Sequence, residues 1–138
     1  MEDLVVAVDP GRAKCGVAVV HRTQGALRRQ VVETAALATA VTALAHEYET
    51  VTVILGDRTY SAETARTLAG LTVQGEALRV RRVDEHHTSE MARSRYWREN
   101  PPRGWKRLIP VTMQVPPVPI DDYVAVILAE RYFCSNSC

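Results

Sequence analysis

Carboxylates stand at three points of this sequence where a regular element is expected to end or begin. Asp9 closes the apolar run 4–8 before a Pro-Gly turn, Asp84 and Glu85 close the run 78–83, and Asp121 and Asp122 open the last apolar run. Burying a carboxylate without a partner is costly. Carboxylates that lie close together repel one another unless a hard cation neutralises them, and oxygen-only ligation suits Mg²⁺ or Mn²⁺. The pattern indicates a divalent-metal site.

Each acidic position also has a simpler interpretation. Asp9 before Pro10 suits a hairpin turn in which the carboxylate is solvated. Asp121 and Asp122 at a helix start cap free N–H groups and complement the helix dipole. Three such positions at element ends are harder to explain by capping and turns alone, so the metal site stays the working hypothesis.

The elements that must position these acids follow from hydrophobic periodicity and from turn residues. Strands are expected at 4–9, 15–21, 27–32, 51–55 and 78–83, and helices at 35–48, 62–71, 89–98 and 121–133. Ser61 is expected to cap the second helix, and Thr88 and Ser89 the third. The Pro-rich segment 100–119 is expected to be a helix-free connection, and residues 134–138 a frayed end.

This order predicts one α/β domain over residues 1–138. The first three strands are joined by short turns and are therefore antiparallel, whereas each later strand is reached through a helix, which favours parallel crossovers. The first and fourth strands are expected to be neighbours in a mixed five-stranded sheet. Asp9 and Glu85 would then lie at the same carboxyl edge, where open α/β sheets place their ligands.

The charge of the chain is nearly balanced overall but unevenly distributed. The formal net charge is +1, yet nine Arg or Lys stand against four Asp or Glu between residues 79 and 107. A local basic excess with aromatic side chains suits a nucleic-acid backbone and its bases. The candidate contacts are Arg93, Arg95, Arg98, Arg103, Trp105, Lys106 and Arg107, with Arg12 and Lys14 near Asp9.

A solvated helix face is the simpler interpretation for Arg93 and Arg95, since Glu90 and Glu99 are available as partners. It accounts less well for Trp97 and Trp105. Arg12 and Lys14 can equally be solvated turn residues.

The compartment and the partner class follow from what the sequence lacks. The three cysteines form no CxxC pair and no metal-ligand cluster, which favours a reducing compartment. No leader pattern and no run long enough to cross a bilayer is present. We therefore expect a cytoplasmic protein that does not associate with membranes.

Three motifs in order resemble one protein family. Asp9-Pro10-Gly11 with 16–19, Asp84-Glu85 with 88–89, and the run 121–128 are similar to the YqgF/RuvX group, RNase H-like proteins related to the RuvC Holliday-junction resolvases. The chain departs from the group's usual Gly-x-Pro after the fourth strand, which here reads Gly56-Asp57, and has His86 to Ser89 where Arg-x-Thr-Thr is usual.

The resemblance implies a metal-dependent nuclease with an RNase H-like fold. Its metal ligands would be Asp9, Glu85 and either Asp121 or Asp122, holding two Mg²⁺ or Mn²⁺ ions. His86 and His87 follow Glu85 directly and are candidates for proton transfer or phosphate contact. The simpler interpretation is that both are histidines of a surface loop. The substrate would be branched DNA of the Holliday-junction type, other structured or single-stranded DNA or RNA, or precursor 16S ribosomal RNA, and a homodimer is a possible form. The alternative is a non-catalytic nucleic-acid-binding or ribosome-assembly factor.

Overall fold

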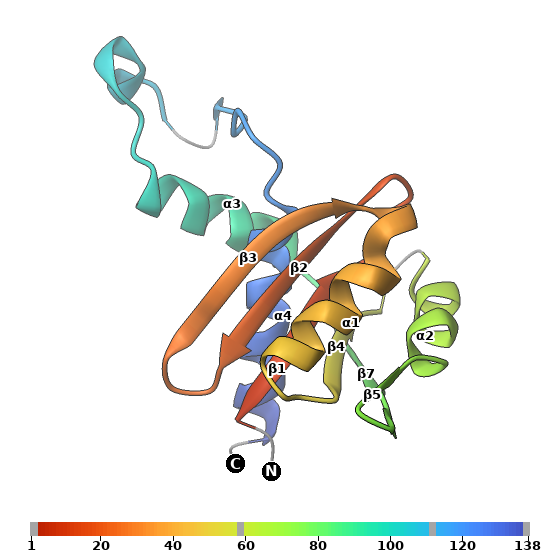
Figure 1. Cartoon of the computed structure of the whole chain (residues 1–138). Coiled ribbons are helices and arrows are strands. Elements are labelled where there is room, and N and C mark those ends of the chain that lie inside the picture. The colour runs from red at the N-terminus through yellow and green to blue at the C-terminus, as the bar shows by residue number, and fades with distance from the viewer. Residues whose placement is uncertain (1–2, 58–59, 111–112, 137–138) are drawn as a thin grey trace.

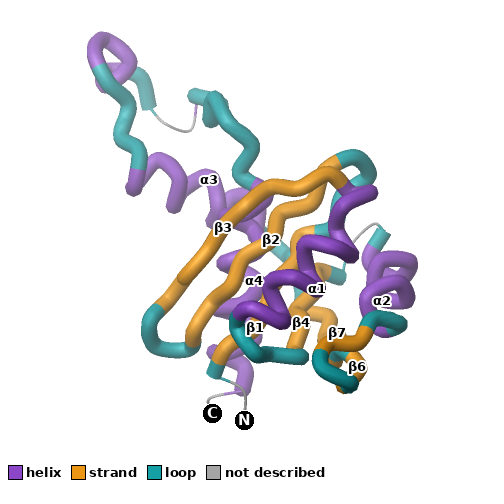
Figure 2. Tube along the Cα trace, in the orientation of Figure 1, coloured by secondary structure: helices purple, strands orange, loops and turns teal. Residues whose placement is uncertain are grey.

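A five-stranded mixed sheet forms the centre of the computed structural model, which describes residues 3–57, 60–110 and 113–136 (Figures 1 and 2). Its strand order is β3-β2-β1-β4-β7. The antiparallel part consists of β1 (Leu4–Asp9), β2 (Lys14–His21) and β3 (Gly25–Glu33), and β4 (Thr52–Gly56) and β7 (Arg79–Val83) continue it in parallel. The predicted sheet and the pairing of its first and fourth strands are confirmed.

Helices cover both faces of the sheet because its central strands are apolar on both sides. The C-terminal helix α4 (Asp121–Asn136) lies behind the sheet in Figure 1, and α1 (Leu37–Glu47) lies in front of it. Alternate residues of β1 divide between the two cores. Val5 and Ala7 pack on the α4 side, whereas Val6 and Val8 pack on the α1 side.

Two further helices connect the parallel strands and the arm. α2 (Ser61–Ala69) follows β4, and α3 (Thr88–Glu99) follows β7 and packs against α4. Neither is capped as predicted. The residues that precede them, Tyr60 and His87, have left-handed backbones with φ of 69° and 61°. Because Tyr60 and His87 occupy the cap positions, Ser61 and Thr88 are the first residues of their helices, and both are buried.

Several local predictions were wrong. A short hairpin, β5 (Thr72–Val73) with β6 (Glu76–Ala77), was missed because two-residue strands leave no periodic signal. A 3₁₀ turn precedes α1 as η1 (Thr34–Ala36). Helix α4 continues through Asn136, so 134–136 are not frayed, and residues 137–138 lie outside the described part.

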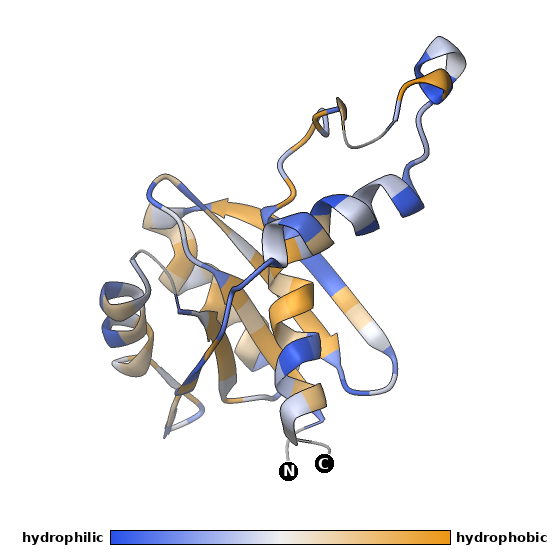
Figure 3. Ribbon diagram, turned by 180° about the vertical axis from the view of Figure 1, so that it is seen from behind, coloured by the Kyte–Doolittle hydropathy of each residue, from blue (hydrophilic) through white to orange (hydrophobic). Residues whose placement is uncertain are grey.

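The segment between α3 and α4 projects from the body of the molecule (Figures 1 and 2). We call residues 101–119 the arm. The described residues of the arm include the 3₁₀ helix η2 (Gly104–Leu108), so the expectation of a helix-free connection was wrong at this turn. Figure 3 shows that the arm alternates hydrophilic and hydrophobic stretches.

Candidate functional site

Asp9 lies between two glycines at the carboxyl edge of the sheet. It pairs with Gly16 of β2, and because Val8 pairs with Leu55, the next residue of β4, Gly56, lies beside Asp9 on the other side. Gly16 and Gly56 belong to strands on either side of β1, so they are roughly 9–10 Å apart.

These three residues face α4. Side chains of a strand alternate between the two faces, and the residue two positions away on each strand, Ala7, Ile54 or Ala18, belongs to the core on the α4 side. The absence of a side chain at both glycines leaves space on either side of the Asp9 carboxylate, on the face that α4 covers.

The other two acidic positions occupy those spaces. A Cβ atom at Gly16 would stand 1.9 Å from the carbonyl oxygen of Asp121, and one at Gly56 would stand 2.3 Å from Cδ of Glu85. The first residue of α4 therefore lies against β2, and the Glu85 carboxyl group lies against β4. All three predicted acidic positions lie at the same edge of the sheet, with Asp9 in the middle.

Glu85 is held in place by its backbone as well as by burial. Its side chain and backbone are only 4% exposed. Its N–H donates to Oδ1 of Asp57 at 3.2 Å, and its carbonyl accepts from both the N–H and the hydroxyl of Thr88, at 3.0 and 2.8 Å. No sequence pattern indicates a role for Asp57, because only the register of β4 and β7 brings it to Glu85.

Charge repulsion is already present at the start of α4. Partial burial raises the pKa of Asp121 above its usual value, the neighbouring Asp122 raises it further, and Lys14 opposes both effects. Asp122 accepts a hydrogen bond from the N–H of Tyr123 at 3.0 Å, close to the capping role considered from the sequence. The environment of Asp121 thus favours a nearby cation.

The acidic side chains do not form a compact ligand group as they are placed. Among the described residues, no three His, Cys, Asp or Glu side chains are grouped closely enough to hold one metal ion together. The spacing of the glycines explains this, because Glu85 and Asp121 lie over strands on opposite sides of β1. The donor atoms are all carboxylate oxygens, which are the ligands that Mg²⁺ and Mn²⁺ prefer.

Arg12 and Lys14 lie near this edge, as their positions after β1 suggested. Lys14 is exposed and acts electrostatically on Asp121. Arg12 donates from Nε to the Tyr60 hydroxyl at 2.7 Å, with its guanidinium carbon 5.8 Å from the ring centroid. The contact joins the loop after β1 to the loop after β4.

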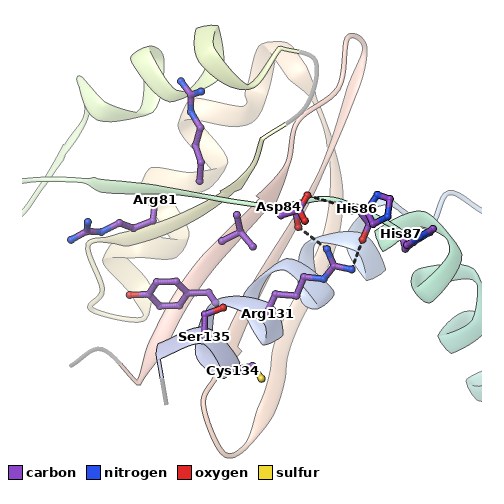
Figure 4. Close-up of a pocket in the computed structure, with 10 residues that line it drawn as sticks. Arg81, Asp84, His86, His87, Arg131, Cys134 and Ser135 are labelled. Carbon is purple, nitrogen blue, oxygen red and sulfur yellow. Dashed lines mark hydrogen bonds between the residues drawn. The ribbon is translucent and has the colours of Figure 1, made fainter. Parts of the chain in front are cut away.

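His86 and His87 lie on the exposed side of the loop that carries Glu85. Their rings are 3.8 Å apart, and Nδ1 of His87 is 3.2 Å from a Glu90 carboxylate oxygen. Both line an open hollow of about 820 Å³ between β7 and the end of α4 (Figure 4). Arg81, which also lines it, points away from them.

The predicted basic surface divides into parts with different surroundings. Arg93 and Arg98 are exposed on α3. Arg95 donates two hydrogen bonds to Glu130 at 2.9 and 2.7 Å, which raise its pKa and tie α3 to α4. Trp97 is partly buried and packs against the core on the α4 side, so it belongs to the core rather than to the exposed basic surface.

The remaining members of that surface lie in the arm. Trp105 is 69% exposed, and the three neighbouring cations are exposed with it: Arg103, Lys106 and Arg107. No Asp or Glu occurs between residues 100 and 120. The arm therefore presents an indole ring and positive charge without a compensating acid of its own.

Three solved structures share this fold over nearly the full chain. Fowlpox virus resolvase with Holliday-junction DNA has 12% identity and a TM-score of 0.61, over 98% of this chain and 99% of that one. RuvC of Thermus thermophilus with a Holliday-junction substrate has 16% identity and a TM-score of 0.59, over 96% and 94%. A second RuvC structure from Thermus thermophilus has 14% identity and a TM-score of 0.55, over 96% and 95%.

These structures confirm the RNase H-like fold, which is shared with RuvC. Membership of the YqgF/RuvX group stays a prediction. No protein-family model and no curated protein matches the sequence. The YqgF/RuvX resemblance therefore rests on the three motifs alone. Within the described part of the chain, no helix has both the length and the apolar character needed to span a membrane.

Proposed function

We propose that this protein is a divalent-metal-dependent nuclease that hydrolyses phosphodiester bonds in branched DNA. The observation that carries the proposal is the meeting of Asp9, Glu85 and the first turn of α4 at one edge of a RuvC-like sheet. Two of the similar structures contain Holliday-junction nucleic acid, which makes branched DNA the first substrate to test.

Each residue has a distinct part in this proposal. Asp9, in the middle, would be shared by two ions, with Glu85 on one side and Asp121 or Asp122 on the other. When bound there, a pair of Mg²⁺ or Mn²⁺ ions would supply activation of a water and stabilisation of the leaving oxygen of an in-line displacement. Arg12 and Lys14 would contact the phosphate that approaches this edge, and His86 or His87 would transfer a proton there.

Binding would extend from this edge to α3 and the arm. The exposed cations of α3 and the arm suit phosphates, and Trp105 suits stacking on an unpaired base. Arg95 would contribute only after leaving Glu130, because its donors on that side are already engaged.

A non-catalytic nucleic-acid-binding protein is the second candidate function. The observation that favours it is that the acidic side chains, as placed, do not form a three-ligand group among the described residues. Such a protein would keep the fold and the basic surface without turnover, for example in ribosome assembly.

The deciding experiment is a cleavage assay on end-labelled four-way junctions, duplexes, single-stranded DNA and structured RNA that includes precursor 16S ribosomal RNA. Wild type and Asp9→Asn are compared in Mg²⁺, in Mn²⁺ and in EDTA. We expect metal-dependent cutting of the junction by the wild type, and none by the variant, with the same melting temperature for both proteins.

Other outcomes of this assay separate the alternatives. Cutting confined to RNA would replace the DNA substrate with an RNA-processing one. Tight binding without cutting under any metal condition would support the second candidate. Cutting that persists in Asp9→Asn would exclude the proposed site. Sedimentation of the protein with and without a junction tests whether it acts as a homodimer.

A further inference from the structure

One arginine joins the helix that carries Asp121 and Asp122 to the loop that carries Glu85. Arg131 extends from α4 to the loop between β7 and α3 (Figure 4). Its Nη1 donates to the carbonyl of Asp84 at 2.7 Å, and its Nη2 donates to the carbonyl of His86 and to Sδ of Met91. The two carbonyls belong to the residues immediately before and after Glu85.

The contacts of Arg131 complete the immobilisation of the Glu85 backbone. Glu85 itself is already bonded at its N–H by Asp57 and at its carbonyl by Thr88. The loop from β7 to α3 has four residues, and the N–H of His86 also donates to the Asp84 carboxylate at 3.0 Å. With both neighbouring carbonyls held, the loop has little freedom to rotate the Glu85 side chain away from Gly56.

Arg131 lies on the same helix as the acidic residues at the start of α4. Arg131 and Asp121 belong to one continuous helix. A helix rises by about 1.5 Å per residue, so their backbones are separated by about 15 Å along a rigid element. A movement of α4 that shifts Asp121 would therefore also pull on the loop of Glu85.

We propose that Arg131 is a positioning residue that fixes Glu85 relative to the carboxylates at the start of α4, and so sets the affinity of this edge for divalent ions. The inference rests on the proposed function, because it concerns the same acids. Arg131 acts through backbone carbonyls and does not itself contact the reacting atoms. Residues that orient metal ligands typically change metal affinity or activity by about 10- to 100-fold when replaced.

The test measures Mn²⁺ binding to the full chain by isothermal titration calorimetry, alongside thermal unfolding. Arg131→Met keeps the aliphatic stem and removes all donors. Arg131→Lys keeps one charged group that can reach one carbonyl but cannot bridge two. Arg22→Met is the matched control, because Arg22 also lies against α4, 4.9 Å from the Phe133 ring, but bonds Asp3 at the far end of the sheet.

We expect the Mn²⁺ dissociation constant to rise by about 10- to 100-fold in Arg131→Met and less in Arg131→Lys, with Arg22→Met unchanged. In cleavage assays, the Mn²⁺ concentration that gives half-maximal rate should rise by the same factor, with substrate KM unchanged. Should Arg131→Met fail to fold, the Lys variant decides the matter. A purely structural role would lower the melting temperature without moving the metal dependence.

The outcomes distinguish this inference from the proposed function. One outcome is that the wild type binds Mn²⁺ and cuts a junction while both Arg131 variants have the same Mn²⁺ affinity and cleavage rate. In that case the positioning role is wrong and the proposed nuclease function is retained. Equal weakening in Arg22→Met would also overturn it. If the wild type binds no Mn²⁺ and cuts nothing, the proposed function itself fails.

Discussion

The acidic edge and the arm both carry side chains that could take part in binding or chemistry, but the two regions differ in how firmly those side chains are held. At the edge, Asp9, Glu85 and the start of α4 are set by strand register, by two glycines and by hydrogen bonds to backbone groups. In the arm, Trp105, Leu108 and Val115 are 69%, 87% and 87% exposed.

The bonds within the arm are local. Gln114 donates to the carbonyls of Lys106 and Ile109, both at 3.0 Å, and Arg107 donates to the Gly104 carbonyl at 3.2 Å. The difference suggests a division of work. Under the proposed function, the reaction, which needs fixed distances, would take place at the edge, and the arm would bind the irregular surface of the nucleic acid.

The strongest test of the packed edge is Gly16→Ala. The new Cβ would meet backbone atoms of Asp121 and Asp122, which cannot move without shifting α4. Overpacking of this kind typically costs 1–3 kcal/mol and occasionally more, and we expect a loss of about 3 kcal/mol in the free energy of unfolding. Urea denaturation measures it. Wild-type stability would show that α4 does not lie against β2.

Gly56→Ala tests the packing on the other side of Asp9. Here the Cβ would meet the end of a flexible side chain, the carboxyl group of Glu85, rather than backbone. We expect a smaller loss of stability, about 1 kcal/mol, together with weaker Mn²⁺ binding because Glu85 is displaced. The measurement is urea denaturation combined with calorimetry. A stability loss equal to that of Gly16→Ala would contradict the placement of Glu85.

Trp105→Ala tests the arm. If the ring stacks on a base, affinity for single-stranded or branched DNA should fall by about 1–3 kcal/mol, measured by fluorescence anisotropy at fixed salt. Thermal stability should not change, because the side chain is largely exposed. The exposed Leu108→Ala serves as a control for loss of apolar surface in the same turn. Unchanged affinity in Trp105→Ala would remove the indole from the interface.

The smallest effect is expected from Asp121→Asn, and it depends on pH. Because the folded state raises the pKa of Asp121, the wild type loses stability as the pH rises from the normal carboxyl range through the raised value. In EDTA at about pH 7, the variant should therefore be more stable, on the order of 0.5 kcal/mol or less, since solvent screens the group. The difference should narrow towards about pH 4. A constant difference across that range would point to helix capping instead.

The sequence by itself determined the order of the five sheet strands and the four α-helices, the mixed sheet and the three acidic positions. Each depends on local information: apolar runs such as 4–8 and 51–55 indicate strands, and an acid that ends such a run must lie at an edge. The motifs at Asp9, Glu85 and Asp121 added the RNase H-like expectation, which the strand order confirmed.

The hydrogen bonds that hold the site in place follow only from the tertiary structure. Asp57 reaches the Glu85 backbone only through the pairing of β4 with β7, and Arg131 reaches the same loop only because α4 crosses behind the sheet. The left-handed starts of α2 and α3 likewise replaced the predicted caps. Periodicity reports which face of an element is apolar, whereas contacts between distant segments depend on how those elements pack in three dimensions.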